Sequence, residues 1–289
     1  MRIGIHGRDF KQKSHQFIEN LLAYLLREGA EVWVSDKLLK LLTRTYAGRV
    51  KVFSMGDSLR RLHAFLSIGG DGTMLESVAY IGRAQVPTLG INTGRLGFLA
   101  TVNREDALAA IDLILAKNFT TEERTLLTLK SNTGLFGRFN FALNDFTIMK
   151  KDSSSMIHVD VFVNKQLLNS YWSDGIIVAT PTGSTGYSLS CGGPLVHPAS
   201  ESFVITPVSP HTLTARPVVV NHEAEISFRI EGRTNRFLVS LDSRFESIDS
   251  SVRLSVKRAA FTTTLIQLPQ YEYFLLLQKK LNWGLDARN

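Results

Sequence analysis

Three glycines surround one carboxylate in the run Gly69-Gly70-Asp71-Gly72-Thr73, which follows a short apolar stretch. Glycine permits positive φ and carries no Cβ, so the backbone amides of such a turn can approach a phosphate closely. A helix is predicted to begin near Thr73, and the positive end of its dipole favours the same anion. We therefore predict that Gly69, Gly70 and Thr73 belong to a phosphate-binding loop.

Asp71 does not suit a loop that only binds phosphate, because its carboxylate repels the anion unless a metal ion or a hydroxyl proton lies between them. A chemical role, such as accepting a proton, accounts better for an acid at this position. The alternative is an aspartate that holds a tight turn or caps the helix. The complete Gly-Gly-Asp-Gly-Thr run after an apolar strand favours the chemical role.

A second polar cluster, rich in hydroxyl groups and glycine, spans residues 180–190. It follows an apolar strand predicted at residues 175–179, and Asp174 precedes that strand. Many small donors and acceptors with little bulk suit the riboses, amides and phosphates of a nucleotide. The alternative is a Ser/Thr-rich turn that caps the next helix, but the cluster is long for such a turn. Cys191 is expected to be a packing residue, since no adjacent histidine would activate its thiol.

Asn144 and Asp145 interrupt an otherwise apolar strand predicted at residues 139–149. A buried amide and a buried acid lower stability unless they are paired. They either pair with backbone groups or bind a polar ligand, and we favour the ligand. Asp242 presents the same choice with less support, and its neighbour Arg244 is a further candidate for a ligand site.

The elements predicted in the first hundred residues alternate between strand and helix, as in an α/β layer. Strands are predicted at residues 3–5, 31–34, 64–68 and 88–91, and helices at residues 16–27, at residues 37–45 and from residue 73. A second glycine-bearing loop, residues 92–99, follows the last of these strands. Because parallel sheets bind ligands at the carboxyl ends of their strands, we expect both glycine loops to open on one crevice.

After a helix predicted at residues 104–117, strands follow strands, so we place a domain boundary near residue 101. Nine short strands predict a sandwich or a folded sheet. They lie at residues 126–130, 139–149, 158–163, 175–179, 218–220, 225–230, 237–241, 252–256 and 262–268. The tail returns to a helix with one apolar stripe at residues 273–283, which we expect to pack on the first domain.

Composition narrows the class of protein. The chain of 289 residues is 44% apolar and 20% charged, as in folded soluble proteins, and no apolar run approaches a membrane span. No secretory leader is visible and one cysteine excludes an internal disulfide, so we expect a cytoplasmic protein without a membrane partner. The net charge of +7 is scattered along the chain, which favours polyphosphate ligands over nucleic acid.

Five segments resemble the NAD kinases, enzymes that phosphorylate the adenosine ribose 2′-hydroxyl of NAD to give NADP. The segments are residues 69–73, 92–99, 144–145, 174–198 and 207–217, and together they span most of the chain. The glycine-aspartate turn alone is weakly specific, since lipid kinases and phosphofructokinases share it. The stretch from Thr180 to Tyr187, with the Gly-Gly-Pro that follows, is much more specific.

The resemblance implies a phosphofructokinase-like α/β domain with a parallel sheet, followed by a mainly β, sandwich-like domain. Residues 1–101 would bind nucleotide, residues 102–268 would bind the dinucleotide, and a C-terminal helix within residues 269–289 would return to the first domain. NAD and ATP are then the expected substrates, and we expect a homo-oligomer, either a dimer or a tetramer.

The resemblance also implies site residues, with Asp71 as the general base and ATP at the loop of Gly69, Gly70 and Thr73. The implied dinucleotide contacts are Asp71, Gly72, Asn144, Asp145, Asp174, Thr185, Gly186, Tyr187, Ser188, Leu189, Ser190 and Ser209. A divalent cation, Mg²⁺ or Mn²⁺, would arrive with ATP. No metal site made by the protein itself is expected, because the sequence has no HExxH motif, paired cysteines or carboxylate cage.

This chain departs from the residues common in that family at three positions. It has Asp145 where the family commonly has glutamate, Gly186 where it has alanine, and Trp172 where it often has arginine. The first two are small changes, whereas the third removes a charge. Trp172 either stacks on the dinucleotide or packs between strands or subunits. Two other functions stay open. A lipid kinase would need a membrane-facing stretch, and a non-catalytic dinucleotide sensor could dispense with Asp71.

Overall fold

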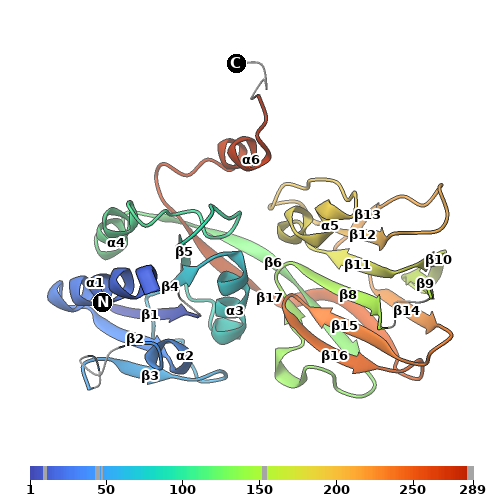
Figure 1. The fold of residues 1–289 in the computed structure, drawn as a ribbon, viewed down its shortest axis with the longest axis horizontal. Coiled ribbons are helices and arrows are strands. Elements are labelled where there is room, and N and C mark those ends of the chain that lie inside the picture. The colour runs from blue at the N-terminus through green and yellow to red at the C-terminus, as the bar shows by residue number, and fades with distance from the viewer. Residues whose placement is uncertain (9–11, 43–45, 47, 152–154, 285–289) are drawn as a thin grey trace. The chain divides into compact units, whose positions relative to one another are not determined.

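The protein divides into two compact units in the computed structural model. The first unit joins Met1–Glu123 to Thr263–Asn289, and the second unit is Arg124–Thr262. The structure describes residues 1–8, 12–42, 46, 48–151 and 155–284. Figure 1 shows the chain as a ribbon and labels most of its helices and strands.

A parallel sheet forms the centre of the first unit. Its strands are β1 (Arg2–Gly7), β2 (Glu31–Ser35), β3 (Lys51–Phe53), β4 (Ala64–Gly69) and β5 (Thr88–Asn92). They lie in the order β5-β4-β1-β2-β3 with parallel neighbours, which confirms the predicted α/β layer. The helices of this unit are α1 (Gln12–Arg27), α2 (Asp36–Leu39), α3 (Asp71–Ile81), α4 (Ala107–Leu115) and α6 (Tyr273–Leu281).

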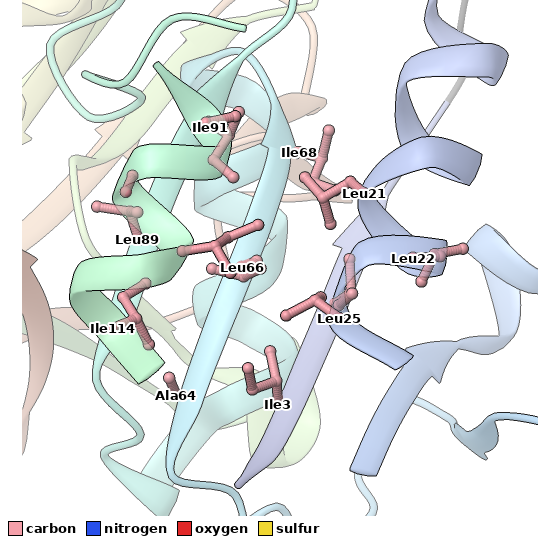
Figure 2. Close-up of a cluster of buried hydrophobic side chains, with 14 of the residues drawn as sticks. Ile3, Leu21, Leu22, Leu25, Ala64, Leu66, Ile68, Leu89, Ile91 and Ile114 are labelled. Atoms are coloured by element: carbon pink, nitrogen blue, oxygen red, sulfur yellow. The ribbon is translucent and has the colours of Figure 1, made fainter. Parts of the chain in front are cut away.

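Alternation along β4 directs its side chains into two apolar layers. Ala64, Leu66 and Ile68 pack with side chains of α1 and α4 on one face of the sheet, as Figure 2 shows. Phe65 points to the other face and packs with Tyr80 of α3. Burying a side chain of this size contributes about 1.5 to 3 kcal/mol. Because both faces are covered, β4 is a rigid support for the glycine-aspartate turn at its carboxyl end.

The second unit is a sandwich of two sheets whose neighbouring strands are antiparallel. Its strands include β8 (Asp145–Lys150), β9 (Ile157–Val163), β10 (Gln166–Ser173), β11 (Gly175–Ala179), β12 (Ser202–Val208), β13 (Val218–Asn221), β14 (Ile226–Glu231), β15 (Phe237–Leu241), β16 (Arg244–Ile248) and β17 (Leu254–Gln267). One sheet has the order β13-β12-β11-β8-β15-β16, and the other includes β10-β9-β14-β17. Residues such as Phe146, Val159 and Phe203 fill the space between them, which confirms the mainly β, sandwich-like prediction.

Two further strands and one helix complete the description. β6 (Thr120–Ser131) pairs with β17 and with the short β7 (Phe141–Ala142). α5 (Tyr187–Ser190) follows the turn η4 (Thr182–Thr185). None of the described helices is both long enough and apolar enough to cross a membrane.

Several elements differ from their predictions. The helix predicted at residues 37–45 is present as α2, which ends at Leu39, and residues 43–45 lie outside the described part. The strands predicted at residues 252–256 and 262–268 are one strand, β17. The pattern also misses β3, β10, β12 and β16. β12 contains Pro207, which is tolerated there because β13 pairs with β12 only as far as Ile205.

The first segment of the first unit continues past residue 101, near which we place the boundary from the sequence, and extends to Glu123. The reason is the apolar face of α4, since Ala107, Ala110, Ile111 and Ile114 are part of the first core. The last residues of β17 also belong to this unit, where Leu265 pairs with Thr88. The C-terminal helix α6 is in the first unit as well.

Candidate active site

Asp71 is the first residue of α3 and follows the N-cap residue Gly70. Its partly exposed carboxylate turns toward the second glycine loop. Oδ2 accepts a hydrogen bond from the amide of Phe98 at 2.8 Å, and Oδ1 accepts from the amides of Leu99 and Ala100 at 2.9 and 3.0 Å. Three consecutive amides therefore set the orientation of the carboxylate.

Gly97 makes this close approach possible, because a Cβ at that position would lie 1.9 Å from Asp71 Oδ1. Asn92 shapes the start of the same loop, since its Oδ1 accepts from the amide of Gly94 at 2.6 Å. The amide of Thr93 donates to the carbonyl of Gly69 at 3.1 Å. The structure thus joins the two glycine loops that the sequence places at neighbouring strand ends.

Thr73 has a structural part in the turn. It is buried, and its amide donates to the carbonyl of Gly70 at 3.0 Å. A Cβ on Gly69 would lie 2.2 Å from the Thr73 hydroxyl oxygen. Gly69 and Thr73 therefore pack directly against each other and define the shape of the predicted phosphate loop.

Two cations that the sequence analysis does not single out lie near this turn. Arg8 follows β1, and its Nη2 is 3.1 Å from the position that a Cβ on Gly72 would occupy. Arg8 and Lys37 both pair with Glu76 of α3. Burial opposes ionisation, but the nearby His6 ring and a hydrogen bond from Lys37 lower the pKa of Glu76 to about 2. Both cations follow the carboxyl ends of parallel strands, which is the signal that could have found them.

In the second unit another carboxylate holds a turn in the same manner. Asp242 Oδ2 accepts from the amide of Leu143 at 3.0 Å, and Oδ1 accepts from the amides of Asn144 and Asp145 at 2.7 and 3.2 Å. Desolvation raises the pKa of Asp242 even though these amides favour its charged form. Of the two predicted alternatives, Asp242 therefore pairs with backbone groups. These bonds also explain why the strand predicted at residues 139–149 is interrupted between β7 and β8.

Asn144 and Asp145 keep side-chain groups that the fold does not use. Asn144 Oδ1 is buried and has no hydrogen-bond partner among the described residues. Asp145 is buried at the start of β8, and desolvation together with the nearby Asp242 raises its pKa to about 7. A Cβ on Gly186 would lie 3.4 Å from Asn144 Nδ2 and 3.8 Å from Asp145 Oδ2. An unsatisfied buried acceptor beside an acid indicates a place for a donor group of a ligand.

The hydroxyl-rich segment, residues 180–190, packs onto this turn. The amide of Thr180 donates to the carbonyl of Asn144 at 2.9 Å, and a Cβ on Gly183 would lie 2.0 Å from that same carbonyl oxygen. Ser188 is buried, and its hydroxyl is 2.8 Å from the hydroxyl of Thr206. Some polar groups of this segment therefore stabilise the fold and are not available to a ligand.

The other predicted contacts of the segment are more open. Thr185, Gly186 and Leu189 are partly exposed, whereas Tyr187 and Ser190 are exposed. Desolvation raises the pKa of the Tyr187 hydroxyl, and Cys191, Asp174 and Asp145 raise it further. Desolvation also raises the pKa of the Cys191 thiol, which fits a packing role.

Three predicted residues lie beside the start of β11, at the opposite end from the hydroxyl-rich segment: Asp174, Ser209 and Trp172. Asp174 Oδ1 is 2.6 Å from Lys150 Nζ, and the amide of Asp174 donates to the carbonyl of Val208 at 2.9 Å. Ser209 follows directly, exposed and with a φ of 45°. Trp172 is 57% exposed, so it is not a core residue between strands of this unit. Trp172 and Lys150 line a groove of about 730 Å³.

The Arg244 side chain forms hydrogen bonds within the second unit. Its guanidinium donates to the carbonyls of Phe139 and Phe141 and lies 5.6 Å from the centroid of the Phe141 ring. Desolvation lowers the pKa of Arg244. In this arrangement the Arg244 guanidinium stabilises the segment that precedes the Asn144 turn.

The residues present fit a metal ion that arrives with a substrate. Among residues 1–8, 12–42, 46, 48–151 and 155–284, no group of three or more His, Cys, Asp or Glu side chains could hold a metal ion. A Mg²⁺ ion bound to triphosphate keeps phosphate and water ligands and needs few from the protein. The donor set is therefore compatible with a cation carried by ATP.

Comparison with known proteins decides the family. The family models described as ATP-NAD kinase N-terminal domain and ATP-NAD kinase C-terminal domain match residues 3–119 and 143–268. The NAD kinase of Cytophaga hutchinsonii is 48% identical over 292 residues, with 100% of both chains covered. The chain belongs to the NAD kinase family. The NAD kinase of Flavobacterium johnsoniae is 40% identical over 294 residues, again with 100% of both chains covered.

Two solved structures share the fold of this NAD kinase family member. Yeast NADH kinase complexed with NADH has a TM-score of 0.85 at 20% identity, and the match covers 100% of this chain and 89% of that one. An NAD kinase from Archaeoglobus fulgidus in complex with ATP has a TM-score of 0.75 at 24% identity and covers 98% and 99%. Family membership sets aside the lipid kinase that the glycine-aspartate turn had left open.

Proposed function

We propose that this chain transfers the γ-phosphoryl group of ATP to the 2′-hydroxyl of the adenosine ribose of NAD, giving NADP, with Asp71 as general base. Membership in the NAD kinase family supports the reaction. The observation that carries the role of Asp71 is its carboxylate, which stands at the N-terminus of α3 inside a glycine turn and is oriented by three backbone amides.

The hydrogen bonds leave one acceptor position for chemistry. A carboxylate offers about four lone-pair sites. Within the described residues three of them are filled, two on Oδ1 and one on Oδ2. We assign the remaining site on Oδ2 to the ribose hydroxyl proton. As the 2′-oxygen bonds to the γ-phosphorus, the bond to ADP breaks and the proton moves to Asp71. A fixed carboxylate avoids the loss of orientation that would slow this step.

The glycine turn and its neighbours bind the donor. Amides of the turn and the dipole of α3 attract the phosphates, and Arg8 adds a positive charge beside Gly72. The divalent cation on the triphosphate, Mg²⁺ or Mn²⁺, neutralises charge on the transferred group. Each of these interactions orients the γ-phosphoryl group toward the hydroxyl that Asp71 deprotonates.

The polar cluster of the second unit binds the dinucleotide. Asn144 Oδ1 is an acceptor without a partner among the described residues, so a ligand amide or hydroxyl satisfies it. Asp145 accepts a second donor, which favours its ionised form. Gly186 leaves space next to both side chains, where an alanine would place a methyl group 3.2 Å from the carbonyl oxygen of Gly183. Asp174, Tyr187 and Ser209 provide further polar contacts.

A coupled assay tests the reaction. The protein is mixed with NAD, ATP and Mg²⁺, and NADP is detected with an NADP-specific dehydrogenase. Parallel reactions replace NAD with NADH and ATP with polyphosphate, which defines the acceptor and the donor. NAD binding without NADP formation under all of these conditions would contradict the proposal and indicate a dinucleotide sensor.

A chelator tests how the metal is held. We expect activity to follow the divalent cation in proportion to ATP, and the melting temperature of the protein alone to stay the same when the chelator is added. A large fall in melting temperature on chelation would show a metal site within the protein and would overturn this part of the proposal.

We also propose that the protein forms a homo-oligomer, a dimer or a tetramer. Leu167 and Trp172 on the edge strand β10 are 52% and 57% exposed, and an edge strand that exposes large apolar side chains favours association. Light scattering coupled to size-exclusion chromatography measures the mass. A monomer at the protein concentration of the assay would contradict this expectation.

A further inference from the structure

The C-terminal helix α6 ends on the loop that holds Asp71. Lys280, in the last turn of α6, donates a hydrogen bond from Nζ to the carbonyl of Leu96. Its ammonium group also lies 5.2 Å from the centroid of the Phe98 ring. A carbonyl dipole and an aromatic face both attract a cation, so one side chain restrains two positions of the loop.

The restrained residues are the ones that orient the carboxylate. Phe98 contacts Lys280 through its ring and donates its amide hydrogen to Asp71 Oδ2. Gly97, between Leu96 and Phe98, passes so close to Asp71 that it has no room for a side chain. A movement of residues 96–98 therefore moves the amides to which the carboxylate is bound. Lys280 and Asp71 are separated by one residue along this path.

The neighbouring lysine provides an internal contrast. Lys279 is exposed and lines a cavity of about 240 Å³ between α6 and the rest of the first unit. The buried side chains of α6 are Leu276 and Leu277. Because a cavity interrupts the packing under the helix, close contacts at its end matter more for where the helix holds the loop. Lys280 makes such contacts and is partly buried.

We infer that Lys280 is a positioning residue for phosphoryl transfer. It holds residues 96–98 and, through the amide of Phe98, sets the direction of the Asp71 carboxylate. The inference rests on the proposed role of Asp71 as general base. It makes α6, which is distant in sequence from the glycine turn, a part of the machinery that this reaction needs.

Three variants test the inference. Lys280→Met removes the ammonium group but keeps an apolar chain of similar length. Lys280→Arg retains a cation that can donate to a carbonyl and stack on a ring. Lys279→Met removes the same charge one residue away. We expect Lys280→Met to lower kcat about 3- to 10-fold while both KM values stay within about twofold, and we expect Lys280→Arg to recover most of the loss. Lys279→Met should match the parent.

The Asp71→Asn background separates positioning from general packing. Once the carboxylate is gone, adding Lys280→Met should leave the residual kcat unchanged, because the two changes act through one group. A further loss of the same size in that background would overturn the inference, as would a parental kcat for Lys280→Met alone. If Asp71→Asn itself is as active as the parent, the proposed function fails instead, so the two failures are distinguishable.

A second route covers the case in which Lys280→Met does not fold. Phe98→Leu removes the aromatic face and keeps the amide that bonds to Asp71. We expect Phe98→Leu to lower kcat less than Lys280→Met does. The double variant of Phe98→Leu and Lys280→Arg should lose only the contribution of the ring to kcat. Parental kinetics for Phe98→Leu would show that the contact between the Lys280 ammonium group and the ring does not restrain the loop, and would overturn the inference.

Discussion

Each unit of the protein contains a carboxylate that accepts hydrogen bonds from three consecutive backbone amides. In the first unit Asp71 holds the amides of residues 98–100, and in the second unit Asp242 holds those of residues 143–145. Oδ1 accepts two of the bonds in both cases. The two arrangements differ in their surroundings. Asp71 begins a helix, near the guanidinium of Arg8, whereas Asp242 has a φ of 53° in a turn and lies next to a second acid, Asp145.

The surroundings assign different roles to similar geometries. A helix N-terminus and a nearby cation stabilise negative charge, so an ionised Asp71 and an anionic substrate can occupy the same region. In the second unit, desolvation and the nearby Asp242 instead oppose the ionisation of Asp145. We therefore propose that Asp71 combines structural hydrogen bonds with chemistry, whereas Asp242 has a structural role and the ligand is bound by Asn144 and Asp145.

The largest expected effect comes from removing the charge on Asp71. Asp71→Asn should lower kcat about 10²- to 10⁴-fold, the range for a general base, while the protein stays folded and binds NAD. NADP formation in the coupled assay, beside isothermal titration with NAD, measures both. Turnover within a few-fold of the parent would contradict a catalytic role for Asp71. Asp71 and Asp242 would then both have structural roles only.

Asparagine also turns an amide hydrogen toward the loop, so a matched variant is needed. Gly97→Ala keeps the carboxylate but places a methyl group where Oδ1 now lies. Its loss of kcat measures the orientation of the carboxylate alone. We expect this loss to be smaller than that of Asp71→Asn. An equal loss would mean that orientation accounts for the whole effect.

The raised pKa of Asp145 predicts a pH-dependent difference in stability. Its pKa of about 7 lies above the ordinary value near 4, so the folded state retains a proton that the unfolded state releases. The stabilisation from this group is complete below about pH 4 and is lost as the pH rises through 7. Asp145→Asn cannot ionise and should therefore gain stability relative to the parent between pH 5 and 8, on the order of 2 to 3 kcal/mol. Urea denaturation at both pH values measures the gain, and a constant difference would show that Asp145 titrates normally.

Asp242→Asn should affect stability and spare chemistry. The substitution leaves at least one of the three amides facing a donor, which costs about 2 kcal/mol in the free energy of unfolding. We expect kcat below the melting temperature to stay within about threefold of the parent, since this acid does not meet the reacting atoms. The exposed Asp249→Asn is the control for loss of one acid. A fall in kcat comparable with that of Asp71→Asn would put Asp242 in the chemistry.

The sequence predicts the first carboxylate better than the second, for a physical reason. The glycines of the turn that carries Asp71 are its sequence neighbours, so the local pattern reveals the turn, although its amide partners lie 27 to 29 positions away. The partners of Asp242 lie 97 to 99 positions away, and no local pattern connects them. The carbonyl partners of Arg244 are likewise distant, at 103 and 105 positions, so its structural hydrogen bonds could not be predicted from the local pattern. The α/β layer was predictable from periodicity, whereas the limit of the first unit depends on the packing of α4 and on the return of β17.

The smallest expected effect concerns Trp172. Its substitution tests whether the dinucleotide contacts the end of the second unit where Trp172, Asp174 and Ser209 lie. The indole is 57% exposed beside a groove that Lys150 also lines, and it offers a stacking face and one N–H donor. If it stacks on the dinucleotide, Trp172→Ala should weaken NAD binding by about 1 kcal/mol, or about fivefold, with ATP affinity and melting temperature unchanged. Trp172→Arg, which restores a planar cation, should keep most of the affinity. Phe245→Ala removes another exposed aromatic side chain of this unit and is the control. Unchanged NAD affinity together with a smaller molecular mass in light scattering would assign Trp172 to a contact between subunits, and the ligand of this cluster would then be bound by Asn144 and Asp145 without it.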